Sequence, residues 1–209
     1  MTESPFGPQP SPLTRPISGH LSGPTIELRR FTSDDAMTLS ELVASNLNHL
    51  RPFMPWASGE MGRSPDDYGA LISAWNDEMA SGMSAFLAII RREEMIGSAG
   101  LHRRRPDQAS LEIGYWVAEH VTRQGVATQA TLLLAEEAFA HHEIDRVELY
   151  CDKSNRASAA VARKAGFRFV GSQPDPLHAL GITAPGQSGV EICSVLSRAA
   201  FNHAWRSKV

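Results

Sequence analysis

The sequence predicts an α/β fold with a mixed, mostly antiparallel central sheet of about seven strands and about four flanking helices. Between residues 84 and 118, three strand-like apolar stretches are joined by short connections, a pattern typical of an antiparallel meander. From residue 125 onward, helical and strand-like patterns alternate. The chain has 209 residues with 42% hydrophobic content, enough for one domain with a substantial core or at most two small ones.

Helix-capping residues define the elements of the first half. Residues 25–31 (TIELRRF) alternate like a strand, and Ser33 is expected to cap a helix over 34–50. After a loop with two prolines, Ser64 is expected to cap a second helix, with Pro65 at its first position and acidic residues in its first turn.

The elements of the second half follow from changes in hydrophobic period. Gly166 is the expected stop of the last helix. A loop rich in proline and glycine, residues 174–189, separates the last two strands. The predicted strands are 84–92, 95–104, 109–118, 146–153, 168–173 and 189–198, and the predicted helices are 125–141 and 156–166.

Residues 1–24 are predicted to be a disordered tail. This segment holds six of the thirteen prolines and very few bulky apolar residues. Such a composition buries too little surface to offset the entropy lost on ordering. The folded domain is therefore expected to span residues 25–209.

Composition excludes several classes of protein. The formal net charge is −3 without long runs of either sign, so a dedicated nucleic-acid binder is not expected. No stretch is apolar enough for a transmembrane helix, and the N-terminus lacks the apolar core of a signal peptide. Cys151 and Cys193 match no zinc or redox spacing. We expect a cytoplasmic protein with no membrane partner and no metal.

A single glycine stands in a polar turn at the start of the predicted helix over 125–141, within VTRQGVATQA (residues 121–130). The first amides of a helix lack intrahelical acceptors and carry partial positive charge, so anions such as phosphates bind there. The strand ending near Val117 and the helix starting near Gly125 form the unit that a phosphate site requires. A purely structural loop would have the same pattern, so this stretch alone leaves both interpretations open.

Two longer stretches carry a resemblance to a family. EIGYWVAEHVTRQGVATQA (residues 112–130) and NRASAAVARKAGFRFVG (residues 155–171) resemble the acetyl-CoA-binding core of the GNAT N-acetyltransferase superfamily. More narrowly they resemble its RimJ/RimL-type branch, which acetylates N-terminal amines of ribosomal proteins, as do TIELRRFTSDDA and NHLRPFMPWA. The resemblance covers residues 25 to about 201. It implies a GNAT fold whose sheet is splayed at the cofactor cleft.

The resemblance also implies which residues bind acetyl-CoA. The strand end at Trp116 and Val117 would pair with the pantetheine arm, and an amide there would polarise the thioester carbonyl. Asn155 would hydrogen-bond the pantetheine from the other side of the cleft. Thr122 stands where the family usually has Arg or Gln, which puts one side-chain contact in doubt but not the backbone amides. The amides that would hold the pyrophosphate belong to Arg123, Gln124, Gly125, Val126, Ala127 and Thr128.

Acetyl transfer needs an uncharged amine, and Glu112 is the candidate base. A model α-amino group has a pKa of about 8 and a lysine about 10.4, so near neutral pH roughly a tenth of the first is free base and far less of the second. A weak base acting through water would therefore serve an N-terminal substrate. Glu112 is alternatively an exposed strand carboxylate or the partner of an arginine.

The leaving group requires little help. Many family members place a tyrosine, as the acid that protonates the thiolate, where this chain has Ala162. Thiolate is a tolerable leaving group, so a hydrogen bond suffices, and Ser158 on the first turn of its helix could donate one. Ser158 would alternatively cap or pack its helix.

Five other residues are candidates for the acceptor side. Phe53, Met54 and Trp56 would line the acceptor mouth, or would anchor their loop onto the core. Tyr150 and His102 are possible site residues, and the sequence does not favour a site over core or surface positions for them.

The function expected from the resemblance is transfer of acetyl from acetyl-CoA to a primary amine by direct attack, most simply a protein N-terminal α-amine. Three alternatives stay open: a small-molecule amine acceptor such as an aminoglycoside, a longer acyl donor such as succinyl-CoA, and a non-catalytic acyl-CoA-binding module motivated by Ala162. A fold without any CoA site would require the loop match to be coincidence. The chain would act as a monomer or a homodimer.

Overall fold

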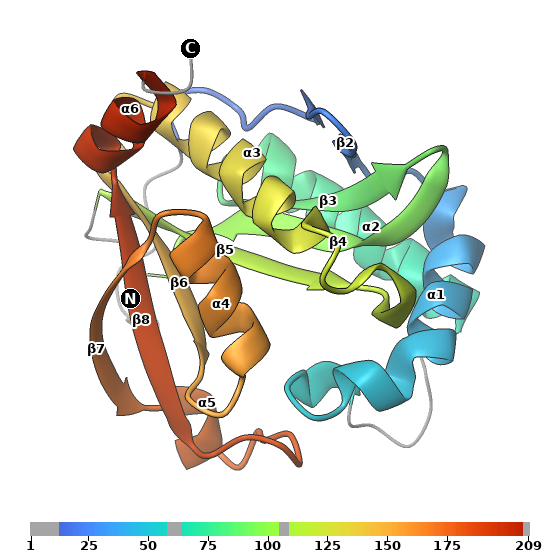
Figure 1. Ribbon diagram of the computed structural model, residues 1–209. Coiled ribbons are helices and arrows are strands. Elements are labelled where there is room, and N and C mark those ends of the chain that lie inside the picture. Colours follow the sequence, from blue (N-terminus) through green and yellow to red (C-terminus); the bar gives the residue numbers. More distant parts are fainter. Residues whose placement is uncertain (1–12, 58–63, 105–108, 207–209) are drawn as a thin grey trace, which may run out of the picture.

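The computed structural model describes residues 13–57, 64–104 and 109–206, which form one eight-stranded sheet with helices on both faces (Figure 1). The strand order is β1-β2-β3-β4-β5-β6-β8-β7, and β5 with β6 is the parallel pair among otherwise antiparallel neighbours. The strands are β1 (His20–Ser22), β2 (Glu27–Arg30), β3 (Ser84–Arg91), β4 (Glu94–His102), β5 (Ser110–Val117), β6 (Arg146–Asp152), β7 (Arg168–Pro174) and β8 (Val190–Ser197). The α-helices are α1 (Asp35–Leu50), α2 (Pro65–Ala80), α3 (Val126–Ala140), α4 (Arg156–Lys164), α5 (Pro176–Ala179) and α6 (Arg198–Arg206). The predicted α/β fold with a mostly antiparallel sheet is confirmed, with β1, α5 and α6 as additions.

The helices divide between the two faces of the sheet. The antiparallel meander β3-β4-β5 is confirmed. Its first turn is tight because Arg92 and Glu93 both take positive φ (52° and 68°), the geometry of a two-residue hairpin loop. Helices α1 and α2 cover one face through a core that includes Phe31, Leu39 and Ile72. Helices α3 and α4 cover the other face over a larger apolar core.

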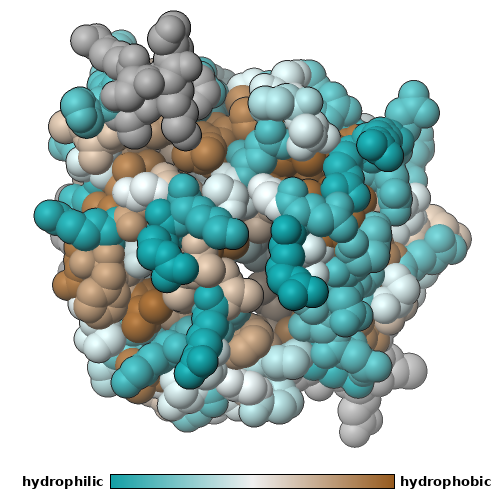
Figure 2. All heavy atoms as spheres, viewed as in Figure 1, coloured by the Kyte–Doolittle hydropathy of each residue, from teal (hydrophilic) through white to brown (hydrophobic). Residues whose placement is uncertain are grey.

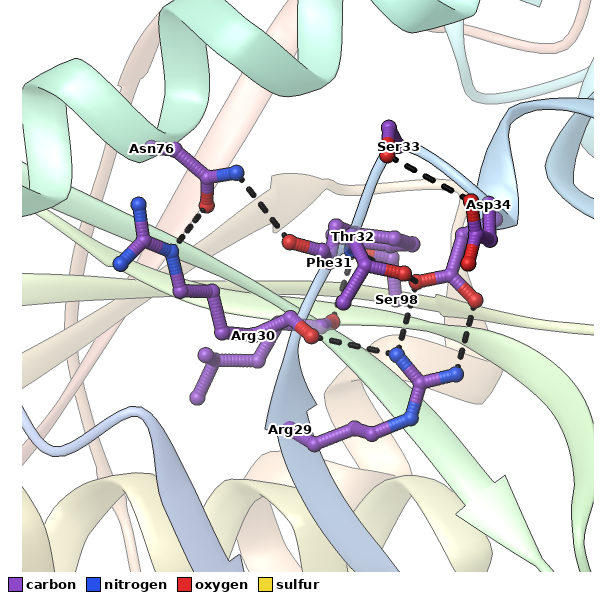
Figure 3. A network of polar contacts seen from close by, with 10 residues as sticks. Arg29, Arg30, Phe31, Thr32, Ser33, Asp34, Asn76 and Ser98 are labelled. Atoms are coloured by element: carbon purple, nitrogen blue, oxygen red, sulfur yellow. Dashed lines mark hydrogen bonds and ion pairs between the residues drawn. The ribbon is translucent and has the colours of Figure 1, made fainter.

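Helix α1 begins at Asp35, one residue later than expected. The prediction that Ser33 caps this helix is wrong: the N-cap is Asp34, and it makes no side-chain cap bond. Asp35 is held by two bonds of 2.7 Å from the Arg29 guanidinium and accepts the Thr32 amide at 2.7 Å (Figure 3). Asp35 thus satisfies the polar groups at the start of the helix. The Ser33 hydroxyl does not cap the helix and lies 3.5 Å from the Asp34 carboxylate.

Helices α2 and α4 begin and end as expected. Ser64 and Asp67 form a reciprocal capping box, and Pro65 is at the first position of α2. Gly166, at φ 88°, follows the end of α4 in the left-handed conformation that favours glycine.

The predicted disordered tail is wrong for residues 13–24, while residues 1–12 lie outside the described part of the chain. Leu13 and Ile17 are buried in the core beside α3, and β1 pairs with β2. Thr14 donates from its amide and its hydroxyl to Glu143 (both 2.8 Å), and the Ser18 amide donates to Glu137 (2.9 Å). Two well-placed apolar side chains thus order an extended proline-containing segment that composition alone assigns to disorder.

Candidate active site

The loop between β5 and α3 presents a row of backbone amides without acceptors. A short 3-10 helix (Glu119–Val121) leads to two left-handed residues, Arg123 (φ 59°) and Gly125 (φ 84°), and α3 begins at Val126. Within the described chain, the six amides from Arg123 to Thr128 make no hydrogen bond, and the next amide, of Gln129, donates to the Gly125 carbonyl at 2.9 Å. A Cβ on Gly125 would meet no atom within 4 Å, so the space beside this residue is open. This is the geometry of an anion site at a helix N-terminus.

The sheet is splayed immediately before this loop. Strands β5 and β6 pair only through residues 110–112 and 146–148. Beyond them β5 stays paired with β4 as far as Val117, and β6 stays paired with β8 as far as Asp152. The two strands therefore diverge, as Figure 1 shows, and the predicted splay of the sheet is confirmed.

Asn155 and Ser158 lie on the β6 side of this cleft, at the start of α4. Asn155 caps the helix by accepting the Ser158 amide at 3.0 Å, and its side-chain nitrogen has no hydrogen-bond partner in the described residues. The Ser158 hydroxyl lies 3.0 Å from the Tyr115 hydroxyl, which comes from β5. Burial raises the pKa of Tyr115 to about 12, so this phenol stays protonated. Tyr115 is not among the predicted site residues, although it lies two positions after the buried Ile113 on β5 and so shares the face covered by α3 and α4.

A cavity of about 740 Å³ lies at the point where the strands diverge, and it is lined from α1 and α2 on one face of the sheet and from the start of α4 on the other. The space-filling view in Figure 2, from the side of α3 and α4, shows a hollow near the middle of the molecule. Of the predicted cofactor and catalytic residues, four line the cavity: Glu112, Trp116, Asn155 and Ser158. The glycine loop and Val117 do not line it. The predicted site thus has two parts, an amide row at one end of the cleft and a cavity at the other.

Glu112 is held in a charged cluster on the cavity wall. Arg104 contacts the Glu112 carboxylate at 3.5 Å and the Glu191 carboxylate at 2.6 Å, and its guanidinium stacks 3.9 Å from the centre of the Tyr150 ring. The Glu112 side chain is only 23% exposed, so the interpretation as an exposed strand carboxylate is wrong, and the interpretation as an arginine partner is confirmed. Burial raises the pKa of Glu112 above its usual range, and Arg104 opposes this shift. A carboxylate with a raised pKa is better suited to act as a base.

Tyr150 and His102 also belong to the cavity lining. The Tyr150 hydroxyl donates to Glu148 at 2.8 Å, which orients the ring that stacks on Arg104. The His102 ring packs against Phe86 with 4.6 Å between ring centres. Burial lowers the pKa of His102 to about 4, so its imidazole is neutral at physiological pH.

The aromatic loop after α1 lies at the same cavity. Phe53, Met54 and Trp56 all line it, and the Trp56 ring lies 6.1 Å from that of Trp116. Trp56 is 46% exposed, so part of its ring faces solvent at the mouth of the cavity. The loop after β7 reaches this region too, because the Gly186 amide donates to the Pro52 carbonyl at 2.9 Å.

The described residues offer no metal site and no membrane-spanning helix. No group of three or more His, Cys, Asp or Glu side chains there is arranged to hold a metal ion. No helix in the described ranges is long and apolar enough to cross a membrane. Cys151 and Cys193 form no disulfide, and their strands are neighbours in a register that pairs Cys193 with Tyr150.

Comparison with known proteins decides the family. The family model described as the acetyltransferase (GNAT) domain matches residues 25–168, well over half of the chain. The chain belongs to this family. Its use of acetyl-CoA, the cofactor predicted from the sequence, is confirmed at the level of the family.

Individual relatives point to the same branch. A Bacillus subtilis (strain 168) protein named as a ribosomal N-acetyltransferase, YdaF, is 28% identical over 158 residues, covering 75% of this chain and 85% of its own. The ribosomal-protein-serine acetyltransferase of Escherichia coli (strain K12) is 25% identical, covering 70% of this chain and 81% of its own. Among solved structures, RimL, described as a ribosomal L7/L12 α-N-protein acetyltransferase in complex with coenzyme A, has the same fold. Its TM-score is 0.75 at 22% identity, over 89% of this chain and 99% of that one.

Proposed function

We propose that this acetyltransferase acetylates the α-amine at the N-terminus of a protein or peptide, with acetyl-CoA bound along the β5–β6 cleft. The observation that carries the proposal is the arrangement of the cleft: it leads from six unpaired amides to a cavity with carboxylates on its wall. The acceptor class is supported by the two relatives, which are named as ribosomal-protein N-acetyltransferases.

Backbone groups would supply most of the binding to the cofactor. The amides of residues 123–128 would donate to the pyrophosphate at the positive end of α3. The free edge of β5 at Trp116 and Val117 would pair with the pantetheine arm, much as a strand pairs with its neighbour. The unpartnered side-chain nitrogen of Asn155 would donate to the same arm from the other side.

The acceptor must first lose a proton, and Glu112 is the group proposed to take it through a water molecule. An α-ammonium has a pKa of about 8, so its conjugate base is readily formed near neutral pH. The raised pKa of the Glu112 carboxyl brings it closer to the pKa of the α-ammonium, which makes the proton transfer easier. Arg104 lies between Glu112 and Glu191, so the cluster has one carboxylate in excess and attracts the ammonium.

The free amine would then attack the thioester carbonyl, and CoA would leave as the thiolate. Ala162, at the position where the family often has a tyrosine, is buried in the core. In this chain a phenol reaches Ser158 from β5 instead, through the 3.0 Å contact of Tyr115 with the Ser158 hydroxyl. A hydrogen bond from Ser158, itself supported by Tyr115, would stabilise the thiolate without a full proton transfer.

A thermal melt tests the cofactor site, and release of free thiol tests the acceptor. Acetyl-CoA at about 100 times its dissociation constant should add about 2.7 kcal/mol of stability. For a chain of this size that corresponds to a rise of roughly 5–10 °C in Tm. In the second assay, peptides with a free N-terminus should release CoA faster than peptides with a blocked N-terminus and an internal lysine.

Three outcomes would contradict the proposal at different levels. No shift in Tm at millimolar acetyl-CoA would remove the cofactor site. A shift without thiol release for any amine would leave a non-catalytic acyl-CoA-binding module. Faster release with polycationic small amines than with peptides would assign the enzyme to small-molecule acceptors.

A further inference from the structure

The proposed reaction leaves one proton without an acceptor. An N-terminal ammonium carries three protons, and the acetylated product carries one on the same nitrogen. Glu112 is proposed to take the first of the two that leave. The second leaves only after the nitrogen has bonded to the carbonyl carbon, and a base on the floor of the acceptor cavity would be placed to accept it.

A histidine on that floor lies against two glycines. Gly100 on β4 and Gly114 on β5 are directly opposite each other in the sheet. A Cβ on Gly100 would lie 3.2 Å from Cε1 of His102, and one on Gly114 would lie 3.4 Å from its Nε2. The imidazole therefore lies across the backbone of both glycines, with the Phe86 ring against it.

The ring nitrogens of His102 take no part in the hydrogen bonds of the described fold. No hydrogen bond or ion pair joins either nitrogen to another described residue, although His102 lines the cavity and is not fully buried. The charged groups on neighbouring elements have other partners: Glu112, opposite His102 in the register of β5, contacts Arg104, and Glu78 from α2 accepts from Ser84, opposite His102 on β3. A neutral imidazole with a free lone pair is a hydrogen-bond acceptor for an incoming amine.

We infer that His102 is a second catalytic base, which accepts an N–H of the free amine and removes its proton as the C–N bond forms. The inference rests on the proposed amine acetylation. The nitrogen lone pair forms the bond to the carbonyl carbon, the C–S bond breaks, the proton moves to the imidazole, and CoA leaves as the thiolate. The imidazolium then passes the proton to water, so the products are the amide, the thiolate and one proton in solution.

A weak base is sufficient at this step. The nitrogen becomes far more acidic as it turns into an amide nitrogen, because its lone pair is committed to the new carbonyl group. An imidazole whose pKa is about 4 can take such a proton and release it at once. The same low pKa keeps the ring uncharged before each turnover, so it does not repel the ammonium from the cavity.

The test compares two variants with two acceptors. His102→Phe keeps an aromatic ring against Phe86 but removes the acceptor nitrogens, and Glu112→Gln removes the first base. The acceptors are a peptide with a free α-amine and the same peptide with an aminooxy group in place of that amine. The aminooxy nitrogen is unprotonated at neutral pH. Initial rates of thiol release and the Tm shift with acetyl-CoA are measured for each protein.

We expect His102→Phe to lower kcat about 100-fold with both acceptors, since the second proton must leave in either case. Glu112→Gln should be defective with the α-amine and close to wild type with the aminooxy peptide. The Tm shift with acetyl-CoA should be unchanged in both variants. Rates of His102→Phe within about threefold of wild type for both acceptors would overturn the inference.

Two further outcomes are distinguishable. If the wild-type chain is stabilised by acetyl-CoA but acetylates neither acceptor, the proposed function fails and the inference falls with it. If His102→Phe does not fold, the imidazole nitrogens of the wild-type chain are followed by NMR with CoA and the unacetylated peptide bound. A shifted His102 nitrogen signal then supports the contact with the amine, and an unchanged one overturns it.

Discussion

The two ends of the cleft differ in what they offer a ligand. The cofactor end presents backbone amides and a free strand edge, whose positions are set by the φ values of Arg123 and Gly125 and by the divergence of β5 from β6. The acceptor end presents side chains from helices α1, α2, α4 and α5, from strands β3, β4, β5, β6 and β8, and from the loops between them. Backbone groups do not depend on side-chain identity, so the first end tolerates sequence change and the second does not. Cofactor use should therefore be common to relatives whose acceptors differ.

The largest effect is expected from a substitution that blocks the cofactor end of the cleft. Gly125→Asp places a carboxylate in front of the amides of residues 123–128, where it would repel the pyrophosphate. Asp tolerates a positive φ better than most residues, and a Cβ at this position meets no atom within 4 Å, so the protein should fold. The rise in Tm with acetyl-CoA should fall from roughly 5–10 °C to near zero.

Gly125→Asn is the matched control, because it has the same shape without the charge. It should keep part of the stabilisation by acetyl-CoA. An undiminished rise in Tm for Gly125→Asp would show that no anion binds at this turn.

A smaller effect is expected from the proposed first base. Glu112→Gln should lower kcat/KM for an α-amine peptide about 100-fold at pH 7. The wild-type rate should fall as pH falls through the raised pKa of Glu112, because the carboxylate acts as a base only when ionised. The variant should lose this dependence and keep only the one set by the amine, near its pKa of about 8.

The variant Glu191→Gln tests whether Glu112 acts as a base or only holds Arg104 in place. It removes the other carboxylate partner of Arg104 and leaves Glu112 in place. If both variants changed the pH profile alike, Glu112 would act only by holding Arg104.

The smallest effect concerns the mouth of the cavity. Trp56→Leu removes an aromatic contact with Trp116, worth about 0.5–1.5 kcal/mol for a typical pair. The KM of a peptide acceptor should rise about 2- to 10-fold, with kcat and the Tm shift with acetyl-CoA unchanged. Met37→Ala, at a similarly exposed apolar residue outside the cavity lining, is the control and should change none of these values. A lowered Tm with an unchanged KM would make Trp56 a packing anchor.

The same division explains what could be predicted from the sequence. The strand, glycine turn and helix around Gly125 are consecutive in the chain, so local patterns locate the cofactor end. The acceptor end is built from contacts between distant residues, such as Arg104 with Glu191 and Gly186 with Pro52, which no local pattern contains. The order of residues 13–24 could not be predicted for a similar reason, since Leu13 and Ile17 pack into a core that forms from the rest of the chain. Ser33 does not act as the expected cap of α1, because Asp35 forms an ion pair with Arg29 of the preceding strand.

The divergence of β5 from β6 also has a consequence for cooperativity. Three residue pairs join the half of the sheet from β1 to β5 to the half formed by β6, β8 and β7. Backbone amides along the open edges should exchange with solvent more readily than those of the paired strands. A cofactor that bonds to both edges would act as an inserted strand and couple two folding units into one. Bound acetyl-CoA would in this way connect the two halves of the sheet. The acceptor cavity would then reach its final shape only with acetyl-CoA in place.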